Sequence, residues 1–312
     1  MEMLAHGSDN IAVLLAEKIG AHEVQEGETA FVESLGEPGG EADRVGIRHA
    51  VVAIERRQAH ADAIRAEAAT LDWDISAYAF HDTNGEEEAG RTAAALCGAG
   101  EADVLMKGNL HTDVFMKSAV SRDAGLRTGK RFVHIFHISH PDGGRPILIS
   151  DAAVNVAPNI ETRHDCIREC ADLLIRLGNP RPKIAILSAT ESPIPSVPSS
   201  MDGRALADWA KANLPYADIS GPLAFDLIMS PDAAATKGMG ADPVAGHADA
   251  IVVPDIVSGN ALFKAFVYLK GGCAAGIVTG AKVPILLTSR ADPAAARIAS
   301  VALAAITCGL PK

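Results

Sequence analysis

Short apolar runs alternate with longer stretches of helical periodicity along most of the chain. The apolar runs begin near residue 45, and several are continuously apolar, as strands buried on both faces of a parallel sheet are. The longer stretches between them have the spacing of helices, so the pattern indicates an α/β fold with helices on the faces of the sheet. The expected strands are residues 51–54, 104–107, 132–139, 146–150, 183–188, 250–254 and 284–289.

Capping residues, prolines and glycines mark where helices begin and end. Asp292 supplies an N-cap, and Pro293 a first helical residue, for an alanine-rich helix that ends at Gly309. Ser258 is the expected N-cap of an earlier helix that stops at Gly271. These signals support helices that fill the gaps between the predicted strands.

Two segments interrupt the alternation of strands and helices. Residues 1–45 hold ten acidic residues against Lys18 and Arg44, which favours a peripheral solvated element or a flexible arm. Residues 191–200, ESPIPSVPSS, follow directly on a predicted strand and are rich in proline and serine. We expect them to form a loop at the carboxyl end of that strand, where open α/β sheets bind ligands.

Composition and charge narrow the class of protein. The 312 residues carry 39 acidic against 28 basic side chains, a formal charge of −11, which argues against a nucleic-acid partner. Five cysteines without secretory spacing favour a reducing cytoplasm. The start has no basic region before its apolar run, and no later run reaches the length of a membrane span. We therefore expect a cytoplasmic protein with no membrane partner.

The richest chemistry lies near the carboxyl end, in KGGCAAGIVTGAKVPILLTSRADP. We expect a glycine-rich turn that lets backbone approach a ligand, followed by a strand that delivers Thr288, Ser289 and Arg290 to its carboxyl end. An anion beside Arg290 would meet both the guanidinium group and the N-terminus of the helix that begins at Pro293. The structural alternative is a polar strand end with a surface arginine.

Metal-site and nucleotide-binding patterns are weak. The sequence has no G-x-G-x-x-G after a strand, no P-loop, no G-x-S-x-G and no H-E-x-x-H motif. Cys166 and Cys170 are four residues apart, but no second ligand pair follows at metal-site spacing. In HIFHISH, strand alternation separates His137 from His134 and His140. The sequence therefore predicts no metal site and no bound cofactor.

Six segments together resemble the phosphate acetyl/butyryltransferase family. Three lie in the second half of the chain: GPLAFD at residues 221–226, VPDIVSGNALFKAFVYL at 253–269 and AGIVTGAKVPILLTSRAD at 275–292. Three others resemble the branch often fused to an enoyl-CoA hydratase domain: ADVLMKGNLHTD at 102–113, GLRTGKR at 125–131 and DAAVN at 151–155. The resemblance covers approximately residues 48–312, and residues 1–45 match nothing recognisable.

The resemblance implies a particular architecture. It implies two α/β domains with mostly parallel sheets and a cleft between them, related in fold to isocitrate and isopropylmalate dehydrogenases, and a homodimer. The first domain would comprise residues 46–140 plus 280–312, and the second residues 141–279. Residues 1–45 would be an acidic arm of unclear role.

The resemblance also implies a reaction, in which an acetyl or other short-chain acyl group moves between phosphate and coenzyme A. The coenzyme is a substrate here, not a resident cofactor. Ser289 matches the serine that hydrogen-bonds the coenzyme A thiol, and Arg290 matches the arginine that grips the acyl phosphate. Lys117 stands where the phosphotransacetylases carry an arginine, which keeps the charge but loses the bidentate fork. The expected substrate-binding residues are His111, Thr112, Lys117, Asn260, Lys264 and Lys282.

The identity of the general base stays open. The phosphotransacetylases place an acid seven residues after the serine, and this position is Ala296 here. Asp292 lies three residues after Ser289, although its Asp-Pro context favours N-capping. Either Asp292 serves both purposes, another acid in the cleft is the base, or catalysis relies on positioning of the reactants.

Two other functions compete with acyl transfer. A metal- and NAD(P)-dependent dehydrogenase of the same superfamily would use two aspartates four residues apart on one helix face, and no two aspartates in the sequence have that spacing. A non-catalytic protein that binds acyl-CoA or phosphate is suggested by Ala296 and Lys117. Turnover of acyl phosphate would separate an enzyme from such a binding protein.

Overall fold

The computed structural model describes residues 50–53, 65–66, 68–70, 72, 74, 76, 79–81, 83–108, 110–287 and 292–309. Its helices are α3 (Gly85–Ala99), α4 (Thr112–Val120), α5 (Ile160–Arg176), α6 (Pro198–Asn213), α7 (Phe225–Met229), α8 (Pro231–Thr236), α9 (Ile256–Lys270) and α10 (Ala294–Gly309). Its strands are β1 (Ala50–Ala53), β2 (Val104–Lys107), β3 (Val133–Ser139), β4 (Ile147–Ser150), β5 (Lys183–Leu187), β6 (Asp218–Leu223), β7 (Ala250–Val252), β8 (Cys273–Thr279) and β9 (Ile285–Leu286). Ser289, Arg290 and the acidic segment 1–45 lie outside the described residues.

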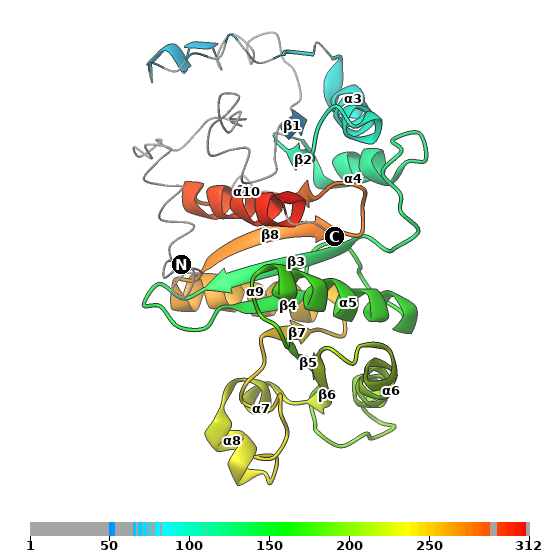
Figure 1. Ribbon diagram of the computed structural model, residues 1–312, viewed down its shortest axis with the longest axis vertical. Helices are drawn as coiled ribbons and strands as arrows, with labels where there is room; N and C mark the ends of the chain where they lie inside the picture. The colour runs from blue at the N-terminus through cyan, green and yellow to red at the C-terminus, as the bar shows by residue number, and fades with distance from the viewer. Residues whose placement is uncertain are drawn as a thin grey trace.

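The described strands form one nine-stranded sheet in the order β1-β2-β9-β8-β3-β4-β7-β5-β6. Figure 1 shows them following one another from β1 and β2 at the top to β5 and β6 at the bottom. Five pairings are parallel, and the three antiparallel ones all involve β3 or β8. The expected α/β class with a mostly parallel sheet is therefore confirmed.

The strands run in two opposite directions, so their carboxyl ends lie on two opposite sides of the sheet. β1, β2, β9 and β3 run one way, whereas β8, β4, β7, β5 and β6 run the other way. We call the edge at which β2, β9 and β3 end the first edge, and the edge at which β4, β5 and β7 end the second edge. Because β8 is seven residues long, the two edges are separated by about 23 Å of strand.

Helices cover both faces of the sheet, and strand alternation decides which residues meet them. Met106 packs in the cluster formed with α5, α6 and α10, whereas its neighbour Leu105 packs in the cluster formed with α3 and α4. On that second face, α7, α8 and α9 cover the other half of the sheet, where Ile149 and Ile251 are fully buried. Among the described residues, no helix combines the length and the apolar character that crossing a membrane requires.

Most predicted strands lie where the apolar runs placed them. β2 coincides with the predicted residues 104–107, and the structure's β3, β4, β5 and β7 begin or end within two residues of the predictions. All four residues of β2 and of β4 are buried, which explains their continuous apolar character. The helix that ends before Gly271 is also confirmed, since Gly271 adopts a left-handed conformation with φ 67°.

Two strands were missed, and one of them replaces a predicted turn. The glycine-rich stretch expected to be a turn forms β8, which pairs with β3 along all seven of its residues. Small residues are needed there, because a Cβ on Gly276 would lie 3.1 Å from the His134 ring and 3.2 Å from the Phe136 ring. β6 contains Gly221-Pro222, which is typical of a turn. It is nevertheless the outermost strand of the sheet, where proline is tolerated.

Two helix predictions also need correction. Asp255, not Ser258, caps α9: its carboxylate accepts the backbone N–H of Ser258 at 2.8 Å. The predicted loop 191–200 ends early, because Pro198 begins α6 as a first-turn proline. In both cases the correct signal was present one to three residues from the position chosen.

The division into two domains stays a prediction. The sheet runs without interruption from β1 to β6, so the proposed boundaries near residues 140 and 280 fall within one hydrogen-bonded sheet. Strand direction reverses across β8 and β3, between the halves that the two domains would contribute.

Candidate active site

β2 and β9 lie side by side and end together at the first edge. They pair in parallel, with Leu105 opposite Ile285 and Met106 opposite Leu286. Neighbouring strands in a sheet are about 4.8 Å apart, so the segments that follow them leave the sheet close together. After β2 the chain continues to His111 and Thr112, and after β9 it continues to Ser289 and Arg290. The first edge therefore receives His111 and Thr112, and Leu286 of β9 ends there three residues before Ser289 in the sequence.

A buried lysine shapes the turn after β2. Lys107 is the last residue of β2 and is only 5% exposed. Its Nζ donates to the carbonyl oxygens of Gly108 and Leu110, both at 3.2 Å. An ammonium group taken out of water must be satisfied by such acceptors, so the lysine fixes the turn that leads to α4.

His111 occupies the N-cap position of α4 and is held by a carboxylate from α3. Its Nδ1 donates to Oε1 and Oε2 of Glu86, at 2.7 and 2.9 Å. Its backbone N–H donates to Oε2 of the same carboxylate at 2.9 Å. The imidazole is nevertheless 71% exposed, whereas the Glu86 side chain is 16% exposed. The carboxylate is thus largely buried and the ring faces outward.

Close packing of α3 on α4 brings these two residues together. A Cβ on Gly90 of α3 would lie 2.7 Å from Oγ of Ser118 on α4, and one on Gly98 would collide with the carbonyl oxygen of Ala124. Only glycine lets the helices approach this closely. The first turn of α3 therefore lies against the start of α4, which places Glu86 beside His111.

The other two predicted residues on α4 are exposed. Thr112 is the first residue of the helix, and the N-cap side chain of His111 makes no capping hydrogen bond. Backbone N–H groups of this first turn are consequently available to an anion. Lys117 lies in the last turn, with its Nζ 3.8 Å from Oε1 of Glu87 and 80% of its side chain exposed. It lies one and a half turns from His111.

Two predicted substrate-binding residues lie at the opposite edge. Asn260 is in the first turns of α9, which follows β7 and so begins at the second edge. Lys282 precedes β9, and its Nζ donates to the carbonyl oxygen of Gly98 at 2.6 Å. Lys264 is exposed further along α9. The structure therefore brings His111 and Thr112 to the first edge and leaves Asn260 and Lys282 at the second.

The residues that begin α10 complete the first edge. Asp292 is half-buried and precedes Pro293, immediately before the helix. Whether it caps α10 is not tested by the described contacts and stays a prediction. Ala296 is 6% exposed, and its carbonyl oxygen accepts the Ser300 hydroxyl at 2.8 Å. The phosphotransacetylases that the sequence resembles carry an acid at this position, whereas the side chain here is a buried methyl group.

The DAAVN motif builds a rigid turn at the second edge. Asp151 is 1% exposed, and its Oδ1 accepts the backbone N–H groups of Ala153 and Val154, both at 2.9 Å. Its Oδ2 accepts the N–H of His134 at 3.0 Å and the side-chain amide of Asn155 at 2.6 Å. Every lone-pair direction of this carboxylate is occupied, so we assign it a structural role.

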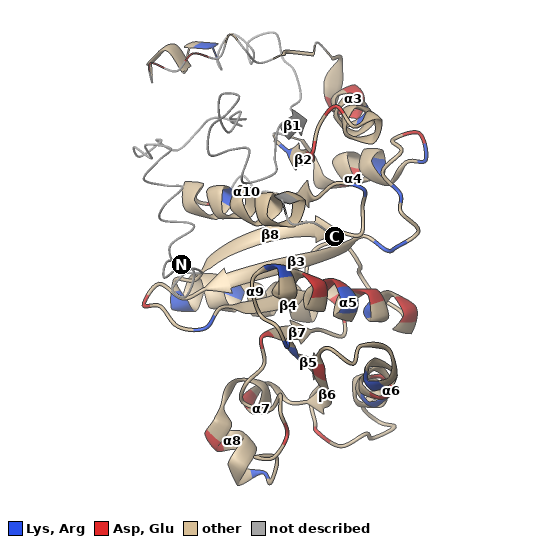
Figure 2. Cartoon of the chain, in the orientation of Figure 1, with Lys and Arg blue, Asp and Glu red and all other residues tan. Residues whose placement is uncertain are grey.

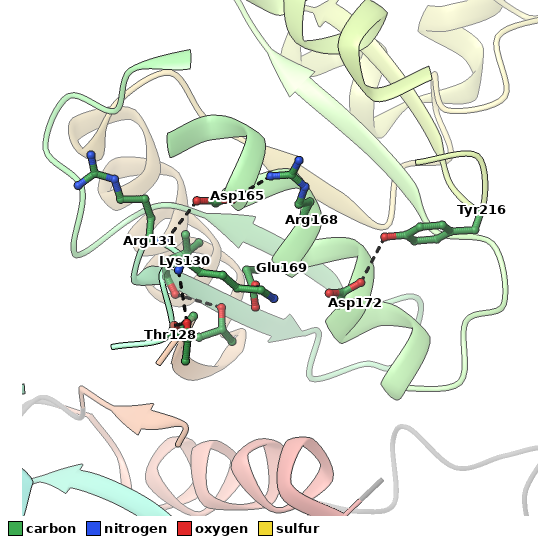
Figure 3. A network of polar contacts seen from close by, with 11 residues as sticks. Thr128, Lys130, Arg131, Asp165, Arg168, Glu169, Asp172 and Tyr216 are labelled. Atoms are coloured by element: carbon green, nitrogen blue, oxygen red, sulfur yellow. Dashed lines mark hydrogen bonds and ion pairs between the residues drawn. The ribbon is translucent and has the colours of Figure 1, made fainter. Parts of the chain in front are cut away.

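Segment 128–131 is tied to α5 by an ion pair and a backbone hydrogen bond (Figure 3). Lys130 contacts Oε1 of Glu169 at 2.7 Å, and this hydrogen bond raises the pKa of the lysine. The backbone N–H of Arg131 donates to Asp165 at 3.2 Å. Figure 2 shows that basic and acidic residues alternate along α5, whereas β8 and β3 contain no Lys, Arg, Asp or Glu. Of the cations of the GLRTGKR motif, Lys130 is thus held by a carboxylate of α5, whereas Nε of Arg127 donates to the carbonyl oxygen of Val120 at 2.7 Å.

Cys166, Cys170 and His134 are buried side chains whose pKa values are shifted by that burial. Burial raises the pKa of the Cys166 thiol to about 12 and raises that of Cys170 well above its usual value, so both remain protonated near neutral pH. His134 is 1% exposed, and burial lowers its pKa, the nearby Asp151 opposing the shift. The part of the chain that the structure describes contains no group of three or more His, Cys, Asp or Glu side chains arranged for a metal ion.

Sequence reasoning missed two residues of the first edge. Lys107 ends an otherwise apolar strand, and that position was a usable signal for a buried cation with a specific role. Glu86 was hidden in a run of three glutamates at the start of α3, where acids are expected for the helix dipole alone. Only the packing of α3 on α4 distinguishes Glu86 from its neighbours.

Comparisons with known proteins identify the family of the chain. Residues 79–306 match the model of a family described as phosphate acetyl/butaryl transferase. The chain is 40% identical over 244 residues to a phosphate acetyltransferase of Rhizobium meliloti, covering 78% of this chain and 77% of that protein. It is 31% identical over 249 residues to a phosphate butyryltransferase of Clostridium acetobutylicum, covering 80% and 82%.

Solved structures of phosphotransacylases share the fold of this chain. The fold is similar to that of a branched-chain phosphotransacylase from Enterococcus faecalis, with a TM-score of 0.70, 26% identity and coverage of 83% of this chain and 98% of that one. A phosphotransacetylase from Streptococcus pyogenes shares the fold with a TM-score of 0.63 at 24% identity, over 71% of this chain and 67% of that one. The match to the family model and the two curated relatives favour acyl transfer over the dehydrogenase alternative. The chain belongs to the phosphate acetyl/butyryl transferase family.

Proposed function

We propose that this phosphate acyltransferase moves an acetyl or short-chain acyl group between phosphate and coenzyme A at the first edge of its sheet. The observation that supports the site is the parallel pairing of β2 with β9: both strands end at the first edge, β2 four residues before His111 and β9 three residues before Ser289 in the sequence. The N-termini of α4 and α10 begin at the same edge. Two helix N-termini and a guanidinium suit a phosphoryl group.

The proposed reaction is direct attack of the thiol on the carbonyl carbon of the acyl phosphate. A C–S bond forms, the bond between the carbonyl carbon and the phosphate oxygen breaks, and inorganic phosphate leaves. Arg290 holds the phosphoryl oxygens, and Ser289 donates a hydrogen bond that positions the sulfur. Lys107 acts indirectly, because it fixes the turn that presents His111 and the start of α4.

The experiment that tests this function is a turnover assay across acetyl, propionyl and butyryl phosphates with coenzyme A, following thioester formation. We expect turnover of at least one of the three. Binding of coenzyme A without turnover of any acyl phosphate would instead identify a non-catalytic binding protein. The same series would rank the enzyme's preference among acyl chain lengths.

Three further properties belong to this proposal. No cofactor is expected, so incubation with EDTA should leave turnover unchanged, whereas loss restored by a divalent cation would contradict it. The protein is expected to work in the cytoplasm, since its five cysteines are free thiols in the structure. A homodimer is the expected assembly, and light scattering on the purified protein would measure it.

A further inference from the structure

The first edge holds a histidine whose second nitrogen is available for proton transfer. A carboxylate can only accept hydrogen bonds, so its contacts at 2.7 and 2.9 Å assign the hydrogen to Nδ1 of His111. In the neutral ring, Nε2 then carries an unshared electron pair.

Several contacts keep this ring in one orientation. Glu86 grips both the imidazole and the backbone N–H of the same residue, and the latter contact is 2.9 Å long. The Glu86 side chain is itself only 16% exposed, and α3 is locked on α4 at Gly90. The imidazole is 71% exposed, so Nε2 is open to a substrate. An oriented base next to a substrate site is the arrangement that general-base catalysis requires.

The two other acids in the first turn of α3 and the buried Lys107 each contact groups other than the His111 ring. Glu87 lies 3.8 Å from Lys117, and Oε2 of Glu88 accepts the backbone N–H of Asn84 at 2.6 Å. Lys107 donates into the turn before His111. Among these neighbours, Glu86 is therefore the carboxylate that acts on the ring.

The reaction needs such a group because the expected base is missing. A thiol with a pKa near about 8.5 is mostly protonated at neutral pH and must lose its proton to attack. The position of the family's acid is the buried methyl of Ala296. His111 follows β2 by four residues and Ser289 follows β9 by three, and these two strands are neighbours in parallel register.

We infer that His111, oriented by Glu86, is the general base that deprotonates coenzyme A in this enzyme. Nε2 takes the thiol proton as the sulfur attacks the carbonyl carbon, and the C–S bond forms. The bond between carbon and phosphate oxygen breaks, and the imidazolium returns the proton to the leaving phosphate. Atoms and charge balance without a co-reactant. The inference rests on the proposed acyl transfer and gives it a named base.

The test compares His111→Asn with the wild-type enzyme at several pH values. Asparagine keeps a polar N-cap residue but has no basic nitrogen. We expect turnover at pH 7 to fall by about 100-fold or more, the usual size of a general-base contribution. The loss should shrink as pH rises toward the thiol pKa, because thiolate then forms without help. Imidazole added to His111→Ala should restore part of the turnover.

Matched variants separate a base from a substrate-binding residue. Glu86→Gln should lower turnover by a smaller factor, about 10-fold, since it keeps the contact and removes the charge. Glu101→Gln and His247→Asn change exposed residues elsewhere and should leave turnover unchanged. Should His111→Asn fail to fold by circular dichroism, His111→Gln replaces it in the same assays.

The outcomes are distinguishable from failure of the proposed function. If the wild-type enzyme turns over no acyl phosphate, acyl transfer itself fails. If it does, and His111→Asn has wild-type turnover, or loses it equally at every pH with a raised KM for acyl phosphate, the base assignment is overturned. A large loss with Asp292→Asn that shrinks at high pH would assign the base to Asp292 instead.

Discussion

The Nζ atom of Lys107 donates to the carbonyl oxygen of Leu110 at 3.2 Å, across the turn between β2 and α4. One residue has a charged side chain and the other an apolar one, yet both are buried, at 5% and 2% exposure. The contact makes the lysine part of the turn. It fixes the geometry of the turn that leads from the end of β2 to His111.

Replacing this lysine should damage the site more than the fold. In Lys107→Met the carbonyls of Gly108 and Leu110 lose a donor, which costs about 1–3 kcal/mol for buried acceptors left unsatisfied. We expect turnover to fall at least about 10-fold with an unchanged circular dichroism spectrum, because the turn loses its geometry. Lys211→Met, at a side chain that is 67% exposed, is the control. Wild-type kinetics in Lys107→Met would show that the turn does not matter.

Arg290→Ala should impair the use of acyl phosphate while the fold stays intact. Loss of one charged, hydrogen-bonded partner of a phosphate should cost roughly 2–4 kcal/mol in the transition state. Steady-state kinetics at sub-saturating acyl phosphate measure this loss directly. A mutant with unchanged kinetics under those conditions would remove Arg290 from the site.

Ser289→Ala should lower turnover at every pH. The hydroxyl is proposed to hold the sulfur during attack, and a neutral thiol and a thiolate both need that positioning. This flat loss contrasts with the pH-dependent loss expected of His111→Asn. A serine mutant with normal turnover would mean that the thiol is not held at this position.

Acid should destabilise the protein through His134. Burial lowers the pKa of this ring, so below its ordinary value of 6.5 the unfolded chain binds a proton that the native state does not bind. The free energy of unfolding is unaffected by this ring above pH 6.5. Below pH 6.5 it decreases as pH falls, by up to about 1.4 kcal/mol per pH unit. Urea unfolding at pH 7 and pH 5 measures the slope.

The variant His134→Leu should flatten that slope, since it removes the titrating group from the core. His247→Asn, at an exposed histidine, should leave the slope unchanged. Equal pH dependence in the wild-type protein and His134→Leu would show that acid acts through other groups.

The sequence by itself determined the strands that are buried on both faces and the chemistry they deliver. Apolar runs located β2, β4 and β5, because most side chains of a strand that helices cover on both faces are buried. The polar motif after β9 and the HT pair after β2 were likewise readable as site residues. These signals are local, since each depends on residues within one element.

Tertiary structure decided what no local pattern encodes. The direction of each strand depends on its pairing, and the antiparallel β3 and β8 send Asn260 and Lys282 to the edge opposite His111. β8 itself was hidden, because its small residues are selected by neighbours such as His134 and not by strand propensity. The pairing of Glu86 with His111 joins residues 25 positions apart and depends on two helices that touch through Gly90. Contacts of this kind arise from packing between elements, so the sequence supplied the groups and the fold chose which of them meet.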